Sequence, residues 1–182
     1  MAEKVKYLDL ARDNYEAGLL KAPPIGVRAQ LRTGIANVDW YEEDYVGALR
    51  EWQASYENLA NDDYKAWVLY QIGRCQQRLG MFHEADATFR DVQKYYPASP
   101  AFTRAATRIG MNAFYVEVVE FPDLSSAEQT AAKLRKEKGL PASRSLDAGK
   151  QLVRIGPLPT FADAKAVQSR LRGDYPTAVI SP

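Results

Sequence analysis

A repeat of 37 residues across the first 110 positions constrains the fold more than any other feature of this sequence. Alanines recur at this interval, at Ala11, Ala48 and Ala85, and a large aromatic residue follows each one four positions later. Residues four apart share one face of a helix, so each pair lets a neighbouring helix approach while the ring fills the gap. Self-similarity at such a period is typical of stacked helical repeats.

A second marker at the same interval predicts the partner helix of each hairpin. Isoleucines at 35, 72 and 109 are each followed by a small residue, and Gly73 would let another helix come close. Residues 78–83 predict the turn between two helices, where Gly80 ends the first one. The sequence therefore predicts helical hairpins over residues 1–111, with a lone helix at 3–22 and a half-repeat at 100–111.

Residues 66–97 resemble a tetratricopeptide repeat, and residues 30–61 are a weaker copy of one. The resemblance is carried by Ile72-Gly73, Gly80, Phe82, Ala85, Phe89 and Pro97. It implies a protein-binding groove lined by the first helix of each hairpin, to which it assigns Asn37, Tyr70, Arg74 and Arg78. In this hypothesis Arg74 and Asn37 hold a peptide backbone or a carboxylate. An ordinary solvated helix face is the alternative.

Composition narrows the range of functions. Of the 182 residues 46% are hydrophobic and 26% charged, which is typical of a globular chain, and the formal net charge of +1 predicts no nucleic-acid partner. One cysteine, Cys75, and one histidine, His83, exclude an intrachain disulfide and a zinc site of the usual Cys/His kind. We expect no metal, no cofactor and no catalytic residues. No apolar run approaches the roughly 20 residues of a membrane-spanning helix, so we expect membrane association only through an anchor absent from this sequence.

The pattern changes after residue 112 and predicts a small βαββαβ domain over residues 112–182. The alternation at 114–121 predicts a strand, the capping box Ser125 to Glu128 begins a helix, and 140–146 forms an edge strand. Residues 151–155 form a third strand ended by Gly156-Pro157, and a helix at 160–172 and a strand at 176–180 complete the order. The two halves match in sequence, which favours a ferredoxin-like sheet with both helices on one face. The fold class is therefore multidomain, α followed by α+β.

This C-terminal stretch resembles a SPOR domain, the sporulation-related repeat of bacterial cell envelopes. The resemblance rests on residues 115–121, on the helix beginning at Ser126-Ala127, and above all on Val153-Arg-Ile-Gly-Pro157. It implies binding to peptidoglycan, chiefly to glycan strands stripped of their stem peptides, and a periplasmic or envelope location.

Alternation places a set of side chains on the open sheet face, where the family holds glycan. We expect Tyr115 and Leu152 to lie against the sugar rings, and Arg154 with Arg144 to meet the carboxylates of muramic acid. Glu117 and Glu120 complete the candidate set. Glu117 replaces a glutamine that the family associates with glycan contact, and Val119-Glu120 replaces a glycine and a small residue that allow a bulge. A cross-strand ion pair between Glu117 and Arg154 is the alternative to a glycan role for these two residues.

These observations favour a non-catalytic envelope protein that binds peptidoglycan through one domain and an unidentified protein partner through the other, in cell division or wall remodelling. The alternative is a protein-interaction scaffold whose sheet domain has lost glycan binding, which the two glutamates favour. Single-stranded RNA binding is weakly supported, because the open face offers one clear aromatic residue, Tyr115, beside two glutamates. Glycan cleavage by Glu117 and Glu120 lacks any sign of a cleft.

Overall fold

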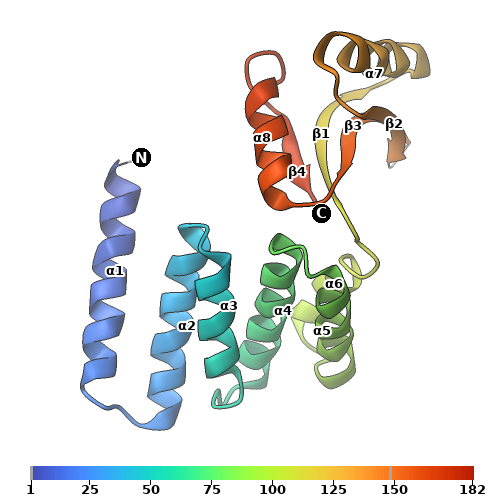
Figure 1. Cartoon of the computed structure of the whole chain (residues 1–182). Helices are drawn as coiled ribbons and strands as arrows, with labels where there is room; N and C mark the ends of the chain where they lie inside the picture. Colours follow the sequence, from blue (N-terminus) through green and yellow to red (C-terminus); the bar gives the residue numbers. More distant parts are fainter. Residues whose placement is uncertain (1, 148) are drawn as a thin grey trace. The chain divides into compact units, whose positions relative to one another are not determined.

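The computed structural model describes residues 2–147 and 149–182, and the chain divides into two compact units. The helical unit comprises residues 1–111 and the sheet unit residues 112–182. The order of elements, helices first and then strands with helices, confirms the predicted fold class of α followed by α+β (Figure 1).

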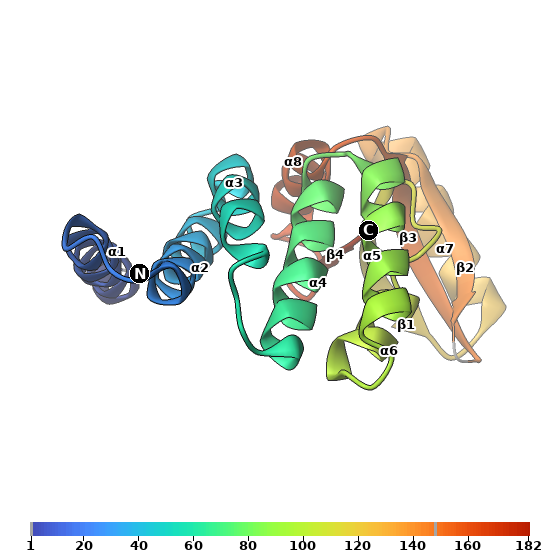
Figure 2. The same cartoon turned by 90° about the horizontal axis from the view of Figure 1, so that it is seen from below.

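The helical unit consists of antiparallel neighbours that follow one another along the chain (Figures 1 and 2). Each helix packs against the next, and α4 also contacts α6. The helices are α1 (Ala2–Leu20), α2 (Ile25–Tyr41), α3 (Tyr45–Tyr56), α4 (Asp62–Arg78), α5 (Phe82–Tyr95) and α6 (Pro100–Ala106). The hairpins α2–α3 and α4–α5 match the two predicted repeats, while α1 and α6 are the predicted lone helix and half-repeat.

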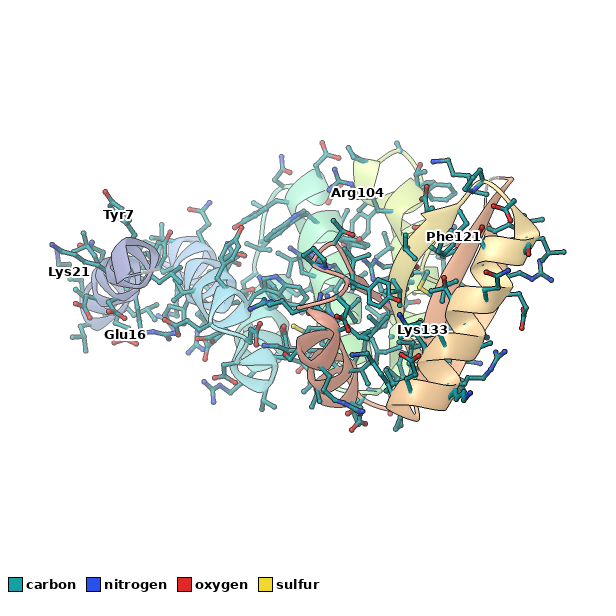
Figure 3. The ribbon with its side chains drawn as sticks, turned by 90° about the horizontal axis from the view of Figure 1, so that it is seen from above. Tyr7, Glu16, Lys21, Arg104, Phe121 and Lys133 are labelled. Carbon is teal, nitrogen blue, oxygen red and sulfur yellow. The ribbon has the colours of Figure 1, made fainter. Side chains whose placement is uncertain are left out.

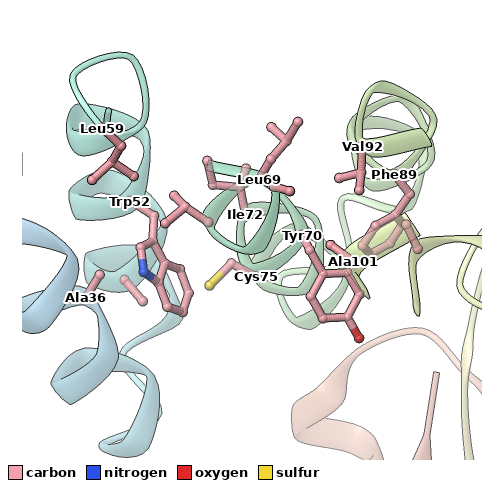
Figure 4. Packing of buried hydrophobic residues seen from close by; sticks show 14 of the residues in the cluster. Ala36, Trp52, Leu59, Leu69, Tyr70, Ile72, Cys75, Phe89, Val92 and Ala101 are labelled. Atoms are coloured by element: carbon pink, nitrogen blue, oxygen red, sulfur yellow. The ribbon is translucent and has the colours of Figure 1, made fainter. Parts of the chain in front are cut away.

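Two of the three repeated aromatic residues lie in the core of the helical unit, while the third, Tyr15, is only partly buried. Trp52 and Phe89 are fully buried, and Trp52 lies between Ala36 and Cys75 (Figure 4). A Cβ atom added to Gly73 would lie 2.5 Å from the Phe89 ring, so the glycine makes room for that ring between α4 and α5. This confirms the close approach that the sequence predicted at Gly73. Cys75 is fully buried, and burial raises the pKa of its thiol to about 12, which fits a packing role.

The sheet unit has the predicted βαββαβ order. Its elements are β1 (Phe114–Phe121), α7 (Leu124–Lys138), β2 (Ala142–Asp147), β3 (Lys150–Leu158), α8 (Phe161–Leu171) and β4 (Val179–Ser181). In the described part of this unit the strand order is β2-β3-β1-β4, and every neighbouring pair is antiparallel. Both helices pack on the sheet, over buried valines and Ile155 of β1 and β3.

Several boundaries in the sheet unit differ from prediction, among them the start of β2, which is Ala142 rather than Leu140. Strand β3 does not end at Gly156-Pro157 but continues to Leu158, because the chain accommodates an irregularity opposite β1 there. Helix α7 begins at Leu124 with Asp123 as its N-cap, since the Asp123 carboxylate accepts a hydrogen bond from the Ser126 amide. The predicted capping box at Ser125 is therefore wrong. Strand β4 covers residues 179–181 rather than 176–180.

Over residues 2–147 and 149–182, no helix is both long enough and apolar enough to span a bilayer.

Candidate functional site

Strand register determines which side chains share the open face of the sheet. Glu117 of β1 lies opposite Arg154 of β3, and Ser143 of β2 lies on the other side of Arg154. Directly opposed residues project to the same face of an antiparallel pair. Since Val116 and Ile155 are buried beneath the helices, the residues that alternate with them form the other face. We call this surface the open face; it comprises Tyr115, Glu117, Glu120, Ser143, Ser145, Leu152 and Arg154.

Arg154 and Tyr115 form the centre of the open face. The guanidinium carbon of Arg154 lies 4.4 Å from the centroid of the Tyr115 ring, which is the geometry of a cation–π contact. The Nε atom of Arg154 is buried and has no hydrogen-bond partner among the described residues. The pair therefore presents a guanidinium group stacked on an aromatic ring, and the arginine covers one face of that ring.

Gly156 positions the Tyr115 ring from below. A Cβ atom at Gly156 would lie 2.6 Å from the ring carbon Cδ1 of Tyr115 and 2.8 Å from the carbonyl oxygen of Phe114. The backbone of Gly156 also has a φ of +146°, which side chains rarely allow. The Val-Arg-Ile-Gly-Pro segment thus supplies both the arginine and the space that the tyrosine needs.

A bulge brings both glutamates to the open face. Glu117 pairs with Arg154 and Val119 pairs with Val153, so β1 carries one extra residue, Val118, between these two pairs. A bulge reverses the alternation that follows it. Glu120 therefore lies opposite Leu152 on the open face, although simple alternation from Glu117 would place it beneath the helices. The bulge forms although Val119 and Glu120 stand where the resemblance led us to expect a glycine and a small residue.

The two glutamates differ in their surroundings. Glu120 forms an ion pair of 2.7 Å with Lys150, whose pKa this contact raises, and both side chains are mostly exposed. In the described part of the chain, the Glu117 carboxylate makes no hydrogen bond and no ion pair, even with Arg154 across the strands. The predicted alternative, an ion pair between Glu117 and Arg154, is not formed.

Two further members of the predicted set have distinct positions. Leu152 lies on the open face between Glu120 and Ser145, and only 9% of its surface is exposed. Arg144 pairs with Val153, whose side chain is buried beneath the helices, so Arg144 belongs to the opposite face of the edge strand. There it donates a hydrogen bond of 2.8 Å to the Gln151 amide oxygen and lies beside α7. The predicted place of Arg144 beside Arg154 is wrong.

The predicted groove residues of the helical unit lie on α2 and α4. Asn37 belongs to α2, and Tyr70, Arg74 and Arg78 recur at helical spacing on one face of α4. The Arg74 guanidinium carbon is 4.3 Å from the Trp40 ring centroid, and Arg74 donates a hydrogen bond of 2.8 Å to the Gln71 side chain. Burial lowers the pKa of Arg74, and the charge of Arg108 also lowers it.

Sequence reasoning missed two residues of this surface, Trp40 and Arg108. Arg108 donates hydrogen bonds of 3.0 Å to the Tyr70 hydroxyl and to the Gln77 side chain. Neither residue belongs to the 37-residue pattern that marked the core. Trp40 stands three positions after Asn37 and so lies on the same helical face. That spacing could have predicted Trp40 as part of this surface.

In the part of the chain that the structure describes, no cluster of three or more His, Cys, Asp or Glu side chains is arranged to hold a metal ion.

Comparison with protein families finds a match in each unit. Residues 110–182 match the model of the SPOR domain, and residues 67–99 match that of a tetratricopeptide repeat. The chain thus carries a tetratricopeptide repeat followed by a SPOR domain, which confirms the resemblance inferred from sequence. No significant match was found among curated proteins or solved structures.

Both families are non-catalytic binding modules. A SPOR domain implies peptidoglycan binding, and a tetratricopeptide repeat implies interaction with a protein. SPOR domains occur in proteins of the bacterial cell envelope.

Proposed function

We propose that this protein is a periplasmic adaptor that binds denuded glycan strands through the open face and a protein partner through its helical repeats. Residues 1–111 and 112–182 are the two functional domains in this proposal. Cell division or wall remodelling is the process in which denuded strands would recruit it. Binding, and not catalysis, is the activity of both domains.

The stacked pair of Tyr115 and Arg154 carries the glycan proposal. A cation stacked on an aromatic ring suits a sugar strand that bears carboxylates, because the guanidinium binds the charge and the part of the ring that it leaves uncovered can pack against a sugar. Leu152 lies on the same strand and face as Arg154, although only 9% of its surface is exposed to a ligand. Ser143 and Ser145 add hydroxyls that can bond sugar hydroxyls and amides.

Co-sedimentation with purified sacculi tests this proposal. We expect the intact protein to sediment with sacculi, and to do so more strongly after an amidase removes the stem peptides. The double variant Tyr115→Ala and Arg154→Ala should lose this binding. Arg144→Ala is the matched control, because it removes an arginine from the opposite face of the same sheet.

Three outcomes separate the alternatives. Full binding by the double variant would show that the glycan-binding site is not on the open face. Equal loss in Arg144→Ala would show that the loss comes from total charge rather than from the open face. Absence of binding by the intact protein before and after the amidase would favour the second candidate function.

That second candidate is a protein-interaction scaffold whose SPOR domain no longer binds glycan. Glu117 favours it, because a carboxylate without a cation at the centre of the open face repels an anionic strand. Glu120 adds a second carboxylate to the same face, partly offset by Lys150.

A further inference from the structure

A pocket between α4 and α6 lies beside the predicted groove residues. It has a volume of about 240 Å³ and is lined by Asp63, Trp67, Tyr70, Pro100, Ala101 and Arg104. Its walls are mostly apolar, with one acidic and one basic side chain among them. A cavity of about 150 Å³ is enough to hold a benzene ring, so this pocket has room for one aromatic or long aliphatic side chain.

Positive charge gathers next to this pocket. Tyr70 lines the pocket with its ring, while its hydroxyl accepts a hydrogen bond from Arg108. Arg74 lies one helical turn farther along the same face of α4, and Arg104 lines the pocket from α6. The pocket and the three arginines therefore form one continuous surface, which we call the arginine groove.

These arginines lack acidic partners of their own. The partners of Arg74 are the Gln71 amide oxygen and the rings of Trp40 and Tyr70. Arg108 is bonded to the Tyr70 hydroxyl and the Gln77 amide oxygen. Within residues 2–147 and 149–182, neither Arg74 nor Arg104 nor Arg108 forms an ion pair.

The local charge differs from that of the chain as a whole. The complete sequence has a net charge of only +1, whereas the arginine groove carries three guanidinium groups and a single carboxylate, that of Asp63. The charge of Arg108 also contributes to the lowered pKa of Arg74, as expected of cations held close together. An incoming carboxylate would relieve this repulsion and form charge-assisted hydrogen bonds.

We infer that the arginine groove binds an acidic peptide segment of the partner protein, with one bulky apolar side chain of that segment seated in the pocket. The inference rests on the proposed protein-docking role of the repeats and specifies the chemistry of the partner. The apolar side chain supplies the buried anchor, and carboxylates on either side of it meet Arg74, Arg104 and Arg108.

Selection from a phage-displayed library of short random peptides on the immobilised full chain tests this inference. Enriched peptides should contain several Asp or Glu residues around one Phe, Trp or Leu. The affinity of the synthetic peptides for the protein is then measured by fluorescence anisotropy. It should fall when the apolar residue is replaced by Ser, and it should fall as the salt concentration rises.

Arg104→Gln is the sharpest variant, because Arg104 (Figure 3) is exposed and its side chain forms no ion pair or hydrogen bond among the described residues. It should weaken binding about tenfold, the change that corresponds to about 1.4 kcal/mol. Arg74→Gln should weaken binding at least as much. Arg90→Gln is the matched control, an exposed arginine on α5 outside the arginine groove, and should leave the affinity unchanged.

Failure of this inference and failure of the docking role are distinguishable. Enrichment of neutral or basic peptides, or affinities of Arg104→Gln and Arg74→Gln that equal that of the parent protein, would overturn the acidic segment and leave protein docking standing. Failure to enrich any peptide would count against both. Arg90→Gln and Arg104→Gln could lose the same affinity. That result would show that the peptide responds only to the net charge of the protein, and it would overturn the arginine groove as the binding site.

Discussion

At the scale of single residues, the chemistry of the open face depends on the neighbours of Tyr115 and Glu117. Gly156 leaves space for the Tyr115 ring, and Arg154 covers that ring rather than pairing with the carboxylate opposite it. Glu117 consequently forms no ion pair among the described residues. Its carboxylate opposes an anionic strand at the centre of the face.

Replacing Glu117 with Gln should strengthen sacculus binding several-fold. The amide removes the repulsion, and it restores a hydrogen-bond donor that a carboxylate lacks. The gain should be greatest at low salt, since the repulsion is screened as ionic strength rises. Co-sedimentation of Glu117→Gln with amidase-treated sacculi over a range of salt concentrations measures this effect.

Glu120→Gln is the control for that change. It also removes a negative charge from the open face, but the charge it removes is already paired with Lys150 at 2.7 Å. A smaller gain is therefore expected. An equal gain from both variants would indicate a general effect of charge, and weaker binding by Glu117→Gln would show that the carboxylate itself contacts the ligand.

Arg144 shows where residue-level prediction from sequence fails. The phase of a strand can be predicted when buried apolar residues mark one face, as Val116 and Val153 do. The edge strand β2 reads Ala-Ser-Arg-Ser-Leu-Asp and offers few such markers, so sequence alone did not place Arg144. The bulge at Val118 and the stack of Arg154 on Tyr115 were also unpredictable, because both depend on contacts across strands.

At the scale of elements, Arg12 links α1 to α2 through ion pairs, beside the packing of the Tyr15 ring on Gly34. Arg12 of α1 lies 2.8 Å from Asp39 of α2, and the Asp39 side chain is only 4% exposed. Burial raises the pKa of Asp39, and Arg12 acts in the opposite direction. Glu42 is a second partner of Arg12 at the end of α2.

Replacing Arg12 with Met should destabilise the helical unit by about 3 kcal/mol at neutral pH, because it leaves a buried carboxylate without its cation. The pKa of Asp39 should then rise further. A carboxyl group whose folded pKa is raised loses stability as the pH rises through that pKa. The difference between variant and parent should therefore be largest at neutral pH and shrink as acid protonates Asp39.

Tryptophan fluorescence during urea unfolding at several pH values measures this difference. All three tryptophans lie in the helical unit, so the signal reports that unit alone. Arg50→Met is the control, since Arg50 is 71% exposed and its partner Glu51 keeps Arg32. If the loss of stability in Arg12→Met does not change with pH, the effect comes from the packing of the Arg12 side chain and not from its charge.

Element types could be predicted from the sequence because the two periodicities are strong. The 37-residue spacing of alanines and aromatic residues placed the helical hairpins, and alternation placed β1 and β3. The end of β3 and the start of α7 were missed, because each depends on local hydrogen bonds rather than on burial. The groove residues Tyr70 and Arg74 were predicted, but their contacts with Arg108 and Trp40 join residues far apart in sequence.

At the scale of the whole molecule, the two proposed binding surfaces differ in chemistry and lie on two separate compact units. The open face pairs an aromatic ring with one arginine, and the arginine groove joins an apolar pocket to three arginines. Under the proposed function, the chain connects two ligands, which neither unit could do alone.

A labelled peptide enriched on the helical unit should therefore sediment with sacculi only when the intact protein is present. Tyr115→Ala with Arg154→Ala should leave the peptide bound to protein in the supernatant, because only the glycan contact is lost. Arg104→Gln should leave the protein in the pellet and release the peptide, because only the groove is weakened. Fluorescence of the labelled peptide and the amount of protein in each fraction measure the two contacts independently. Release of the peptide by added sacculi would instead mean that the two ligands compete, and the chain would then select between them rather than connect them.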